Sequence, residues 1–377
     1  FPYFRENSST CMWLHLPLGA VFLLFVSALG AVTAWMFRRW RKRRGLDRQR
    51  RVEEATQALS DELWFDDAGV VTARGAALQE LGWDEADVAA KIRELRKEQS
   101  HQAGVGLAYL LGDFTTLATT RAAEPNPSFV RLKDAFWLCP DPVGNDVLCP
   151  RDGRPGCALV DWIPKEHRRM QTHFMSWTWK YELRQLQSAL GAWKTSVALD
   201  PSHVFFFMCF FTNNQFRIIV EGTSTGSDDL ERIFGENLKR IGNVVAVLDK
   251  WDEPVYLKRV WTIYEQYMAC AMEVPVTFVM PQEAMAALAE QVSLGEVGIQ
   301  RVTASLSVVN SARAEAWDPQ DEQRVKEAIR KSVGFDRVNQ HVRSALVQWV
   351  GMALRERFRD LVNRAAAGNQ HGRRVSL

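Results

Sequence analysis

The chain has 377 residues, of which 47% are hydrophobic and 24% are charged, a composition that is ordinary for a folded protein. Its net charge of +2 is unevenly distributed, because residues 38–51 hold nine Lys or Arg side chains and one Asp, which leaves −6 for the rest of the chain. A mildly acidic body argues against a nucleic-acid groove as the main function of the protein.

An apolar run near the start of the chain predicts a membrane anchor. Leu16–Phe37 is 22 residues without a charge, and a helix of that length, at about 1.5 Å per residue, crosses a hydrocarbon core of about 30 Å. The basic string RRWRKRR follows at Arg38, which places the carboxyl side in the cytosol. A cleaved signal peptide is the alternative, but its basic residues would precede the apolar run. We therefore predict a single-pass membrane protein, anchored by residues 1–44, with a cytosolic C-terminal domain.

The cysteines give little indication of a metal. Cys139, Cys149 and Cys157 share a loop-rich stretch with His167 and His173 nearby, which permits a zinc site. The close C-x-x-C pairing of most structural zinc sites is absent. We expect reduced thiols and no metal site.

Two regions come before the predicted main domain. Residues 45–135 have helical spacing at Glu53–Leu63 and at Asp84–Glu98, where Asp84 is a plausible cap, and they predict a helical juxtamembrane region. Residues 136–170 are rich in turn formers and predict a hairpin-like lead-in.

Residues 171–305 predict an α/β domain. Apolar runs that do not alternate with polar residues are typical of strands buried on both faces, which means a parallel sheet flanked by helices. We expect strands at Phe174–Trp177, Val204–Phe211, Val244–Leu248 and Val276–Met280, with a weak fifth strand at Ile299–Val302.

Helices are expected between these strands and after them. Leu230–Ile241 stops at Gly242, a residue that favours the left-handed conformation at a helix end. Asp252 is expected to cap the helix after the third strand, with Pro254 in its first turn. Residues 306–377 predict two C-terminal helices broken at Gly334.

Polar and aromatic side chains follow the predicted strands, where parallel sheets bind ligands. The candidates for ligand binding are Trp177, Trp179, Asn213, Asn214 and Asp249. Each has a structural alternative: the tryptophans can close the core, the amides can cap the loop, and Asp249 can form an ion pair with a lysine. The chain contains neither G-x-G-x-x-G nor G-x-x-x-x-G-K-[ST], so no phosphate-binding loop is predicted.

Three stretches resemble a divergent TIR (Toll/interleukin-1 receptor) domain of the kind found in membrane-anchored proteins of unicellular algae and protists. They are FMSWTWKYE, FFFMCFFTNNQ and VVAVLDKWDEPVYLKRVWTIYEQ, and the last places Trp261 and Glu265 as such domains commonly place a Trp and a Glu. The resemblance implies a flavodoxin-like parallel sheet and association with itself or with other TIR-like proteins. In members that cleave NAD, the glutamate at the position of Glu265 is catalytic. Trp261, one turn before Glu265 on the same helix face, is a further candidate for ligand binding, since its ring can stack on nicotinamide or adenine.

The chain departs from the pattern of the resemblance at three points. Thr262 stands where many relatives have Cys, and Gln266 stands where Leu is usual. The Arg-Asp-x-x-Pro-Gly element that relatives carry after the second strand is matched here only by Arg151–Gly156, before the first strand.

These patterns lead to three hypotheses of function. The first is a membrane-anchored signalling or assembly protein whose TIR-like domain acts by protein–protein association. The second is an NAD-cleaving glycohydrolase that uses Glu265, since a carboxylate stabilises the positive charge that develops on ribose; NAD would be its substrate, and no cofactor is expected. The structural alternative for Glu265 is a solvated residue near Lys258. The third hypothesis is a structural membrane protein whose sheet domain has lost any ligand.

Overall fold

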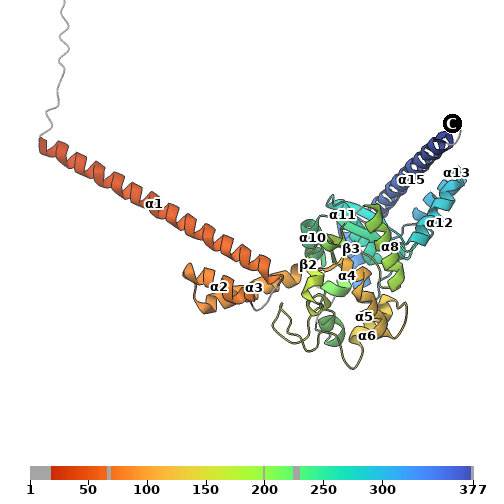
Figure 1. The fold of residues 1–377 in the computed structure, drawn as a ribbon, viewed down its shortest axis with the longest axis horizontal. Helices are drawn as coiled ribbons and strands as arrows, with labels where there is room; N and C mark the ends of the chain where they lie inside the picture. The colour runs from red at the N-terminus through yellow and green to blue at the C-terminus, as the bar shows by residue number, and fades with distance from the viewer. Residues whose placement is uncertain (1–17, 66–68, 198–199, 224–229, 375–377) are drawn as a thin grey trace, which may run out of the picture. The chain divides into compact units, whose positions relative to one another are not determined.

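The computed structural model describes residues 18–65, 69–197, 200–223 and 230–374. The chain divides into two compact units, Phe1–Ile92 and Arg93–Leu377. We call the second the sheet unit, because it contains the β-sheet drawn in Figure 1.

The first unit is helical. It holds only part of the helical juxtamembrane region predicted at residues 45–135, because residues 93–135 belong to the sheet unit. Helix α1 (Leu18–Leu63) packs against α2 (Gly69–Glu80), and the Arg48 guanidinium donates to the Leu81 carbonyl oxygen at 2.8 Å. The predicted cap is confirmed, because Asp84 Oδ1 accepts from the Asp87 amide at 2.7 Å at the start of α3 (Glu85–Gln102).

Much of the predicted membrane span, Leu16–Phe37, lies outside the residues whose side chains are described. Across the described residues, no helix is both long enough and apolar enough to cross a membrane. The described part of the run is exposed at Leu29, Val32 and Phe37, each with more than half of its surface accessible.

A mixed six-stranded sheet forms the centre of the sheet unit, in the order β2-β1-β4-β3-β5-β6. The strands are β1 (Ala103–Gly106), β2 (Arg168–Met170), β3 (His173–Ser176), β4 (Phe205–Phe207), β5 (Val244–Val247) and β6 (Val276–Val279). The four strands β4, β3, β5 and β6 are parallel to one another, whereas β1 is antiparallel to both β2 and β4. The α/β class is therefore confirmed, and the prediction of a purely parallel sheet is wrong.

The unpredicted strand β1 is short and contains two glycines. A Cβ atom at Gly104 would lie 2.9 Å from the Phe206 carbonyl oxygen, so glycine permits the close approach of β1 to β4. Because this strand has four residues and directly follows a helix, its sequence carries no period by which to recognise it.

Two of the predicted strands need correction. The run Val204–Phe211 forms only the three-residue strand β4, and it then turns into the short helix α9 (Cys209–Thr212). The run is continuous in sequence because both parts are buried, and a buried strand and a buried helix share this pattern. The predicted fifth strand is part of helix α13 (Glu296–Leu306), which approaches α12 (Gln282–Ser293) closely at Gly298.

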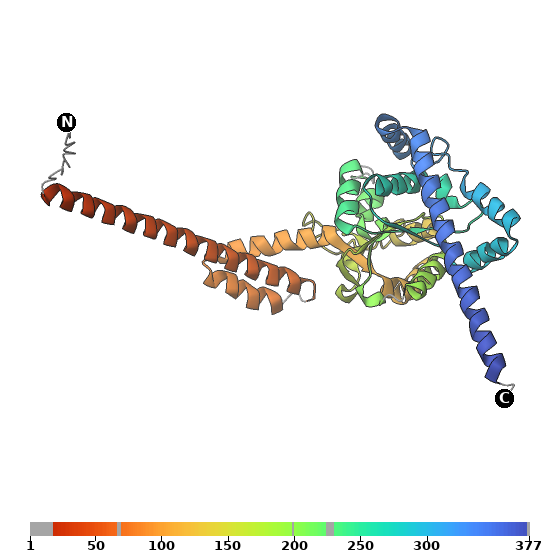
Figure 2. The same cartoon turned by 90° about the horizontal axis from the view of Figure 1, so that it is seen from above.

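The helices that flank the sheet agree better with the sequence. Helix α10 (Leu230–Ile241) ends as predicted, with Gly242 at φ +72°. Gly334, at φ +80°, separates α14 (Pro319–Ser332) from α15 (Phe335–Arg374), which crosses the sheet unit in Figure 2. The remaining helices are α4 (Leu107–Leu111), α5 (Asp113–Ala122), α6 (Phe129–Trp137), α7 (Leu159–Trp162), η1 (Lys165–His167), α8 (Leu183–Ser196), η2 (Pro201–His203), η3 (Phe216–Val220), η4 (Val255–Lys258) and α11 (Val260–Ala271).

The prediction that Asp252 caps the helix after β5 is wrong. A short 3₁₀ turn, η4, comes first, and α11 begins at Val260. Asp252 instead accepts a hydrogen bond at 3.0 Å from the Ser305 hydroxyl of α13. The inserted turn places Tyr256 in the core, with 0% of its surface exposed.

Candidate functional site

Glu265 lies on the second turn of α11, where its carboxyl group meets the end of the central strand β3. The Ser176 hydroxyl, on the last residue of β3, donates to Glu265 Oε2. Ser176 Oγ is also 2.6 Å from the Tyr256 hydroxyl oxygen. Ser176 and Tyr256 are fully buried, while Glu265 retains some accessible surface. The Glu265 carboxyl therefore lies at the carboxyl ends of the parallel strands, the edge at which such sheets bind ligands.

The environment of Glu265 favours its protonated form. Burial raises its pKa from 4.5 to about 8, although the hydrogen bond from Ser176 acts in the opposite direction. Lys258, the predicted neighbour of a solvated Glu265, pairs with Glu253 at 3.1 Å. Glu265 is thus a mostly protonated, desolvated acid at neutral pH at the end of a parallel sheet, a combination more frequent at functional sites than elsewhere.

Thr262, which stands where many TIR relatives have Cys, fixes the backbone of Tyr256. The Thr262 hydroxyl donates to the Tyr256 carbonyl oxygen and lies 3.0 Å from the Arg259 carbonyl oxygen. It therefore ties η4 to the start of α11. Burial raises the pKa of Tyr256 well above its usual value, so its hydroxyl keeps its proton.

The two predicted tryptophans lie close to this region. Trp177 is buried and meets the Phe129 ring edge-on, with ring centroids 4.5 Å apart. Its indole nitrogen is buried without a hydrogen-bond partner among the described residues. Trp179 donates to Cys209 Sγ at 3.3 Å, and burial raises the pKa of the Cys209 thiol to about 12, an effect to which the charge of Glu265 adds. Both rings help to close the core, and Trp179 also borders the Glu265 region through Cys209.

Asp249 and Trp261 are near the same end of the sheet but contact different groups. Asp249 follows β5 and accepts from the Val255 amide at 2.8 Å, which fixes the loop that leads to Tyr256. Burial raises the pKa of Asp249. Trp261 is half-buried one turn before Glu265, on the same face of α11, as its spacing predicts.

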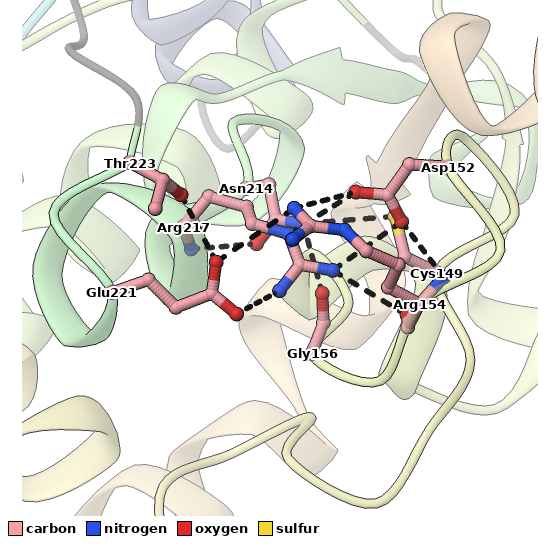
Figure 3. Close-up of polar contacts among 8 residues, drawn as sticks. All are labelled: Cys149, Asp152, Arg154, Gly156, Asn214, Arg217, Glu221 and Thr223. Carbon is pink, nitrogen blue, oxygen red and sulfur yellow. Dashed lines mark hydrogen bonds and ion pairs between the residues drawn. The ribbon is translucent and has the colours of Figure 1, made fainter.

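Asn214 does not join the Glu265 region. It belongs to what we call the Arg217 cluster, drawn in Figure 3 and made of Cys149, Asp152, Arg154, Gly156, Asn214, Arg217, Glu221 and Thr223. Its amide nitrogen donates to the Gly156 carbonyl oxygen at 3.0 Å, and its Oδ1 accepts from the Arg217 amide at 3.2 Å. These are the loop-capping contacts that the sequence offered as the alternative role for Asn214. Asn213, its half-buried neighbour, follows α9.

The centre of the cluster is the buried guanidinium of Arg217, whose side chain is 6% exposed. It donates to both carboxylate oxygens of Asp152, at 3.1 and 3.3 Å, and pairs with Glu221. It also donates to the Arg154 carbonyl oxygen. The string Arg151–Gly156 precedes β3 in sequence, yet in space it packs against the segment that follows β4.

Gly156 provides a test of this packing. It has φ +95°, and a Cβ atom there would lie 2.4 Å from the Phe216 ring, whereas Gly153, at φ +72°, has open space around it. We expect Gly156→Ala to lower the free energy of unfolding by about 2 kcal/mol more than Gly153→Ala does, because backbone strain is common to both and only Gly156 adds overpacking. Urea unfolding followed by tryptophan fluorescence measures the difference, and equal losses would show that the contact does not contribute.

Sequence reasoning missed the residues that orient the site. The position of Ser176 at the end of a buried strand could have marked it as a candidate. Nothing in the sequence around Tyr256 indicates that its hydroxyl meets Ser176, which lies 80 residues away in the chain.

Among the described residues, no three His, Cys, Asp or Glu side chains are grouped so that they could hold a metal ion. Lys180 and Lys250, which follow Trp179 and Asp249, are exposed beyond the strand ends.

Comparison with known proteins identifies no relative: no family model, no curated protein and no solved structure matches the chain.

Proposed function

We propose that the sheet unit cleaves the bond between nicotinamide and ribose in NAD, with Glu265 as the catalytic carboxylate. The observation that carries this proposal is the position of the Glu265 carboxyl: it is buried, hydrogen-bonded to Ser176, and at the carboxyl ends of parallel strands. The reaction consumes water and yields nicotinamide, ADP-ribose and a proton.

The chemistry requires the ionised form of Glu265. As the bond to nicotinamide breaks, positive charge develops on the ribose, and a nearby carboxylate stabilises that charge. The nicotinamide glycoside is itself cationic, so its binding favours ionised Glu265 and releases the proton that the free protein holds at neutral pH. Burial makes the carboxylate a stronger stabiliser of this charge than it would be in water.

The strand order supports the TIR-like interpretation of the sheet. In chain order, the four parallel strands are arranged as second, first, third and fourth, which is the start of the flavodoxin-like order. Trp261 and Glu265 lie on the helix after the third of these strands, where the resemblance expects them.

Nicotinamide release from NAD by the full chain tests the proposal. We expect Glu265→Gln to lower the release rate by about a hundredfold or more, since the amide cannot supply the negative charge. Glu290→Gln, on the exposed face of α12, is the matched control and should leave the rate unchanged. A Glu265→Gln protein with full activity would remove this residue from the mechanism. Absence of release from the wild-type protein would favour the signalling or assembly function through protein association.

We also propose that the start of α1 anchors the protein in a membrane. The side chains of Leu29, Val32 and Phe37 are about half exposed, although they are apolar, and the basic residues 38–44 follow them. Val32→Arg should increase the fraction of protein released from membranes by alkaline extraction, because a cation within a span costs up to about 3 kcal/mol. Gln57→Arg adds the same charge outside the run and should leave the protein membrane-bound; release of both variants to the same extent would contradict the proposal.

A further inference from the structure

Ser176 connects two groups that come from different parts of the sheet unit. Its hydroxyl oxygen lies 2.6 Å from the hydroxyl of Tyr256, in the turn after β5, and its hydroxyl donates to Glu265 Oε2, on α11. Neither Ser176 nor Tyr256 has accessible surface. Water therefore does not compete for these hydrogen bonds, and each hydroxyl must find its partner within the protein.

The direction of the hydrogen bonds follows from the chemistry of the three groups. Tyr256 keeps its proton, because burial raises its pKa well above the usual value and the charge of Glu265 raises it further. It donates to Ser176 Oγ, and the Ser176 proton is then directed to Glu265 Oε2. This arrangement places two successive donors toward one carboxyl oxygen, which favours a negative charge there.

We propose that Ser176 and Tyr256 are positioning residues for Glu265: together they hold Oε2, leave Oε1 for the substrate, and stabilise the ionised carboxylate that the reaction needs. This inference rests on the proposed function, in which Glu265 is the catalytic carboxylate. The hydrogen bond from Ser176 is made to Oε2 alone of the two carboxyl oxygens. Thr262 supports the arrangement from the other side, because its hydroxyl holds the backbone of Tyr256.

Few other titratable groups face this set of side chains. Cys209 on α9 interacts with the charge of Glu265, while Cys270 on α11 and the buried Tyr181 interact with Tyr256. Burial raises the pKa of both thiols, so they remain protonated over the range in which Glu265 titrates. A shift in the titration of Glu265 therefore reports on its hydroxyl partners.

The test is a direct titration of Glu265 in the full chain. The protein is labelled with ¹³C at the glutamate side-chain carboxyl carbons, and the Glu265 signal is assigned as the one absent from Glu265→Gln. We expect Ser176→Ala to raise the pKa of Glu265 by about one pH unit, because a hydrogen bond to a charged group is lost. Tyr256→Phe should raise it by less, since the Ser176 bond remains. The matched controls are Tyr267→Phe, whose ring packs against His341 of α15, and Ser293→Ala, at the end of α12; both should leave the pKa of Glu265 unchanged.

The pH profile of kcat/KM is a second measurement, and it would not shift if Ser176 had a purely structural role. In Ser176→Ala, kcat/KM at pH 7 should fall about tenfold and recover as the pH approaches 9, because the limb of the profile shifts with the pKa of Glu265. An unchanged or lowered Glu265 pKa in Ser176→Ala would overturn the inference. If Ser176→Ala does not fold, the Tyr256→Phe titration tests the inference instead, because a raised pKa of Glu265 supports it and an unchanged or lowered pKa overturns it. The carboxyl titration needs no turnover, so a failure of the proposed function and a failure of this inference are distinguishable.

Discussion

Raising the pH from 5 to 9 should lower the free energy of unfolding of the sheet unit by about 4 kcal/mol through Glu265 alone. The pKa of Glu265 is about 8 in the folded chain and 4.5 when unfolded. Between these values the folded state binds more protons than the unfolded state, so stability falls as the pH rises. The loss begins near pH 4.5 and is complete above about pH 8, where both states are ionised.

Urea unfolding at several pH values, followed by tryptophan fluorescence, measures this loss. Glu265→Gln is neutral at every pH and should unfold with nearly the wild-type free energy at pH 5, yet be the more stable protein at pH 9. Glu290→Gln should follow the wild type throughout. The buried thiols of Cys149, Cys157 and Cys209 destabilise all three proteins alike at high pH, since burial raises their pKa values. A Glu265→Gln curve parallel to that of the wild type would show that Glu265 is not desolvated in solution.

The instability of ionised Glu265 has a direct relation to function. A buried acid at a strand end would be replaced without loss by a neutral residue if the site served only to close the core. Hydroxyls placed to hold an ionised carboxylate, as those of Ser176 and Tyr256 are, suit a site for a cationic ligand: the ligand supplies the charge that the free site lacks. Stability lost to an unfavourable group at a site is a common cost of activity.

Most of the fold could be predicted from the sequence, because a long apolar run indicates a buried element without knowledge of its partners. Strands β5 and β6 lie within the predicted ranges, and α10 has its predicted bounds, since a buried strand and an amphipathic helix with a glycine stop are each specified locally. Strand β1 was missed because its identity depends on contact with Phe206, which is about a hundred residues away. The run Val204–Phe211 was assigned too long a strand because burial, rather than strand geometry, sets its composition.

Residues of the candidate site could be predicted only where the residue type and its position in the sequence were enough to suggest a role. Glu265 and Trp261 were found from their spacing and from a resemblance, and Trp177 from its place after a strand. Ser176 and Tyr256 are an ordinary serine and an ordinary tyrosine in sequence, and only the chain fold brings their hydroxyls to 2.6 Å. Arg217 was missed for the same reason, since its partner Asp152 lies 65 residues earlier.

The ionisation of Glu265, which lowers the stability of the protein as the pH rises, should raise the rate of NAD cleavage. Only the ionised form of Glu265 stabilises the charge on ribose, so kcat/KM should rise about tenfold for each pH unit below the pKa, about a thousandfold from pH 5 to pH 8, and then level off. NAD carries a permanent positive charge on nicotinamide, so the substrate contributes no titration of its own. Initial rates at low NAD concentration report the pKa of the free protein.

Proton release on ligand binding tests the same linkage without turnover. At pH 7, where Glu265 is mostly protonated, a non-hydrolysable NAD analogue with a cationic pyridinium ring should release close to one proton per site, because it binds the ionised form. Calorimetry in buffers of different ionisation enthalpy counts that proton. Glu265→Gln should release none, and Glu290→Gln should release as many as the wild type. A rate that is independent of pH between 5 and 8, together with binding that releases no proton, would mean that Glu265 is ionised before the substrate arrives and that burial does not govern its charge.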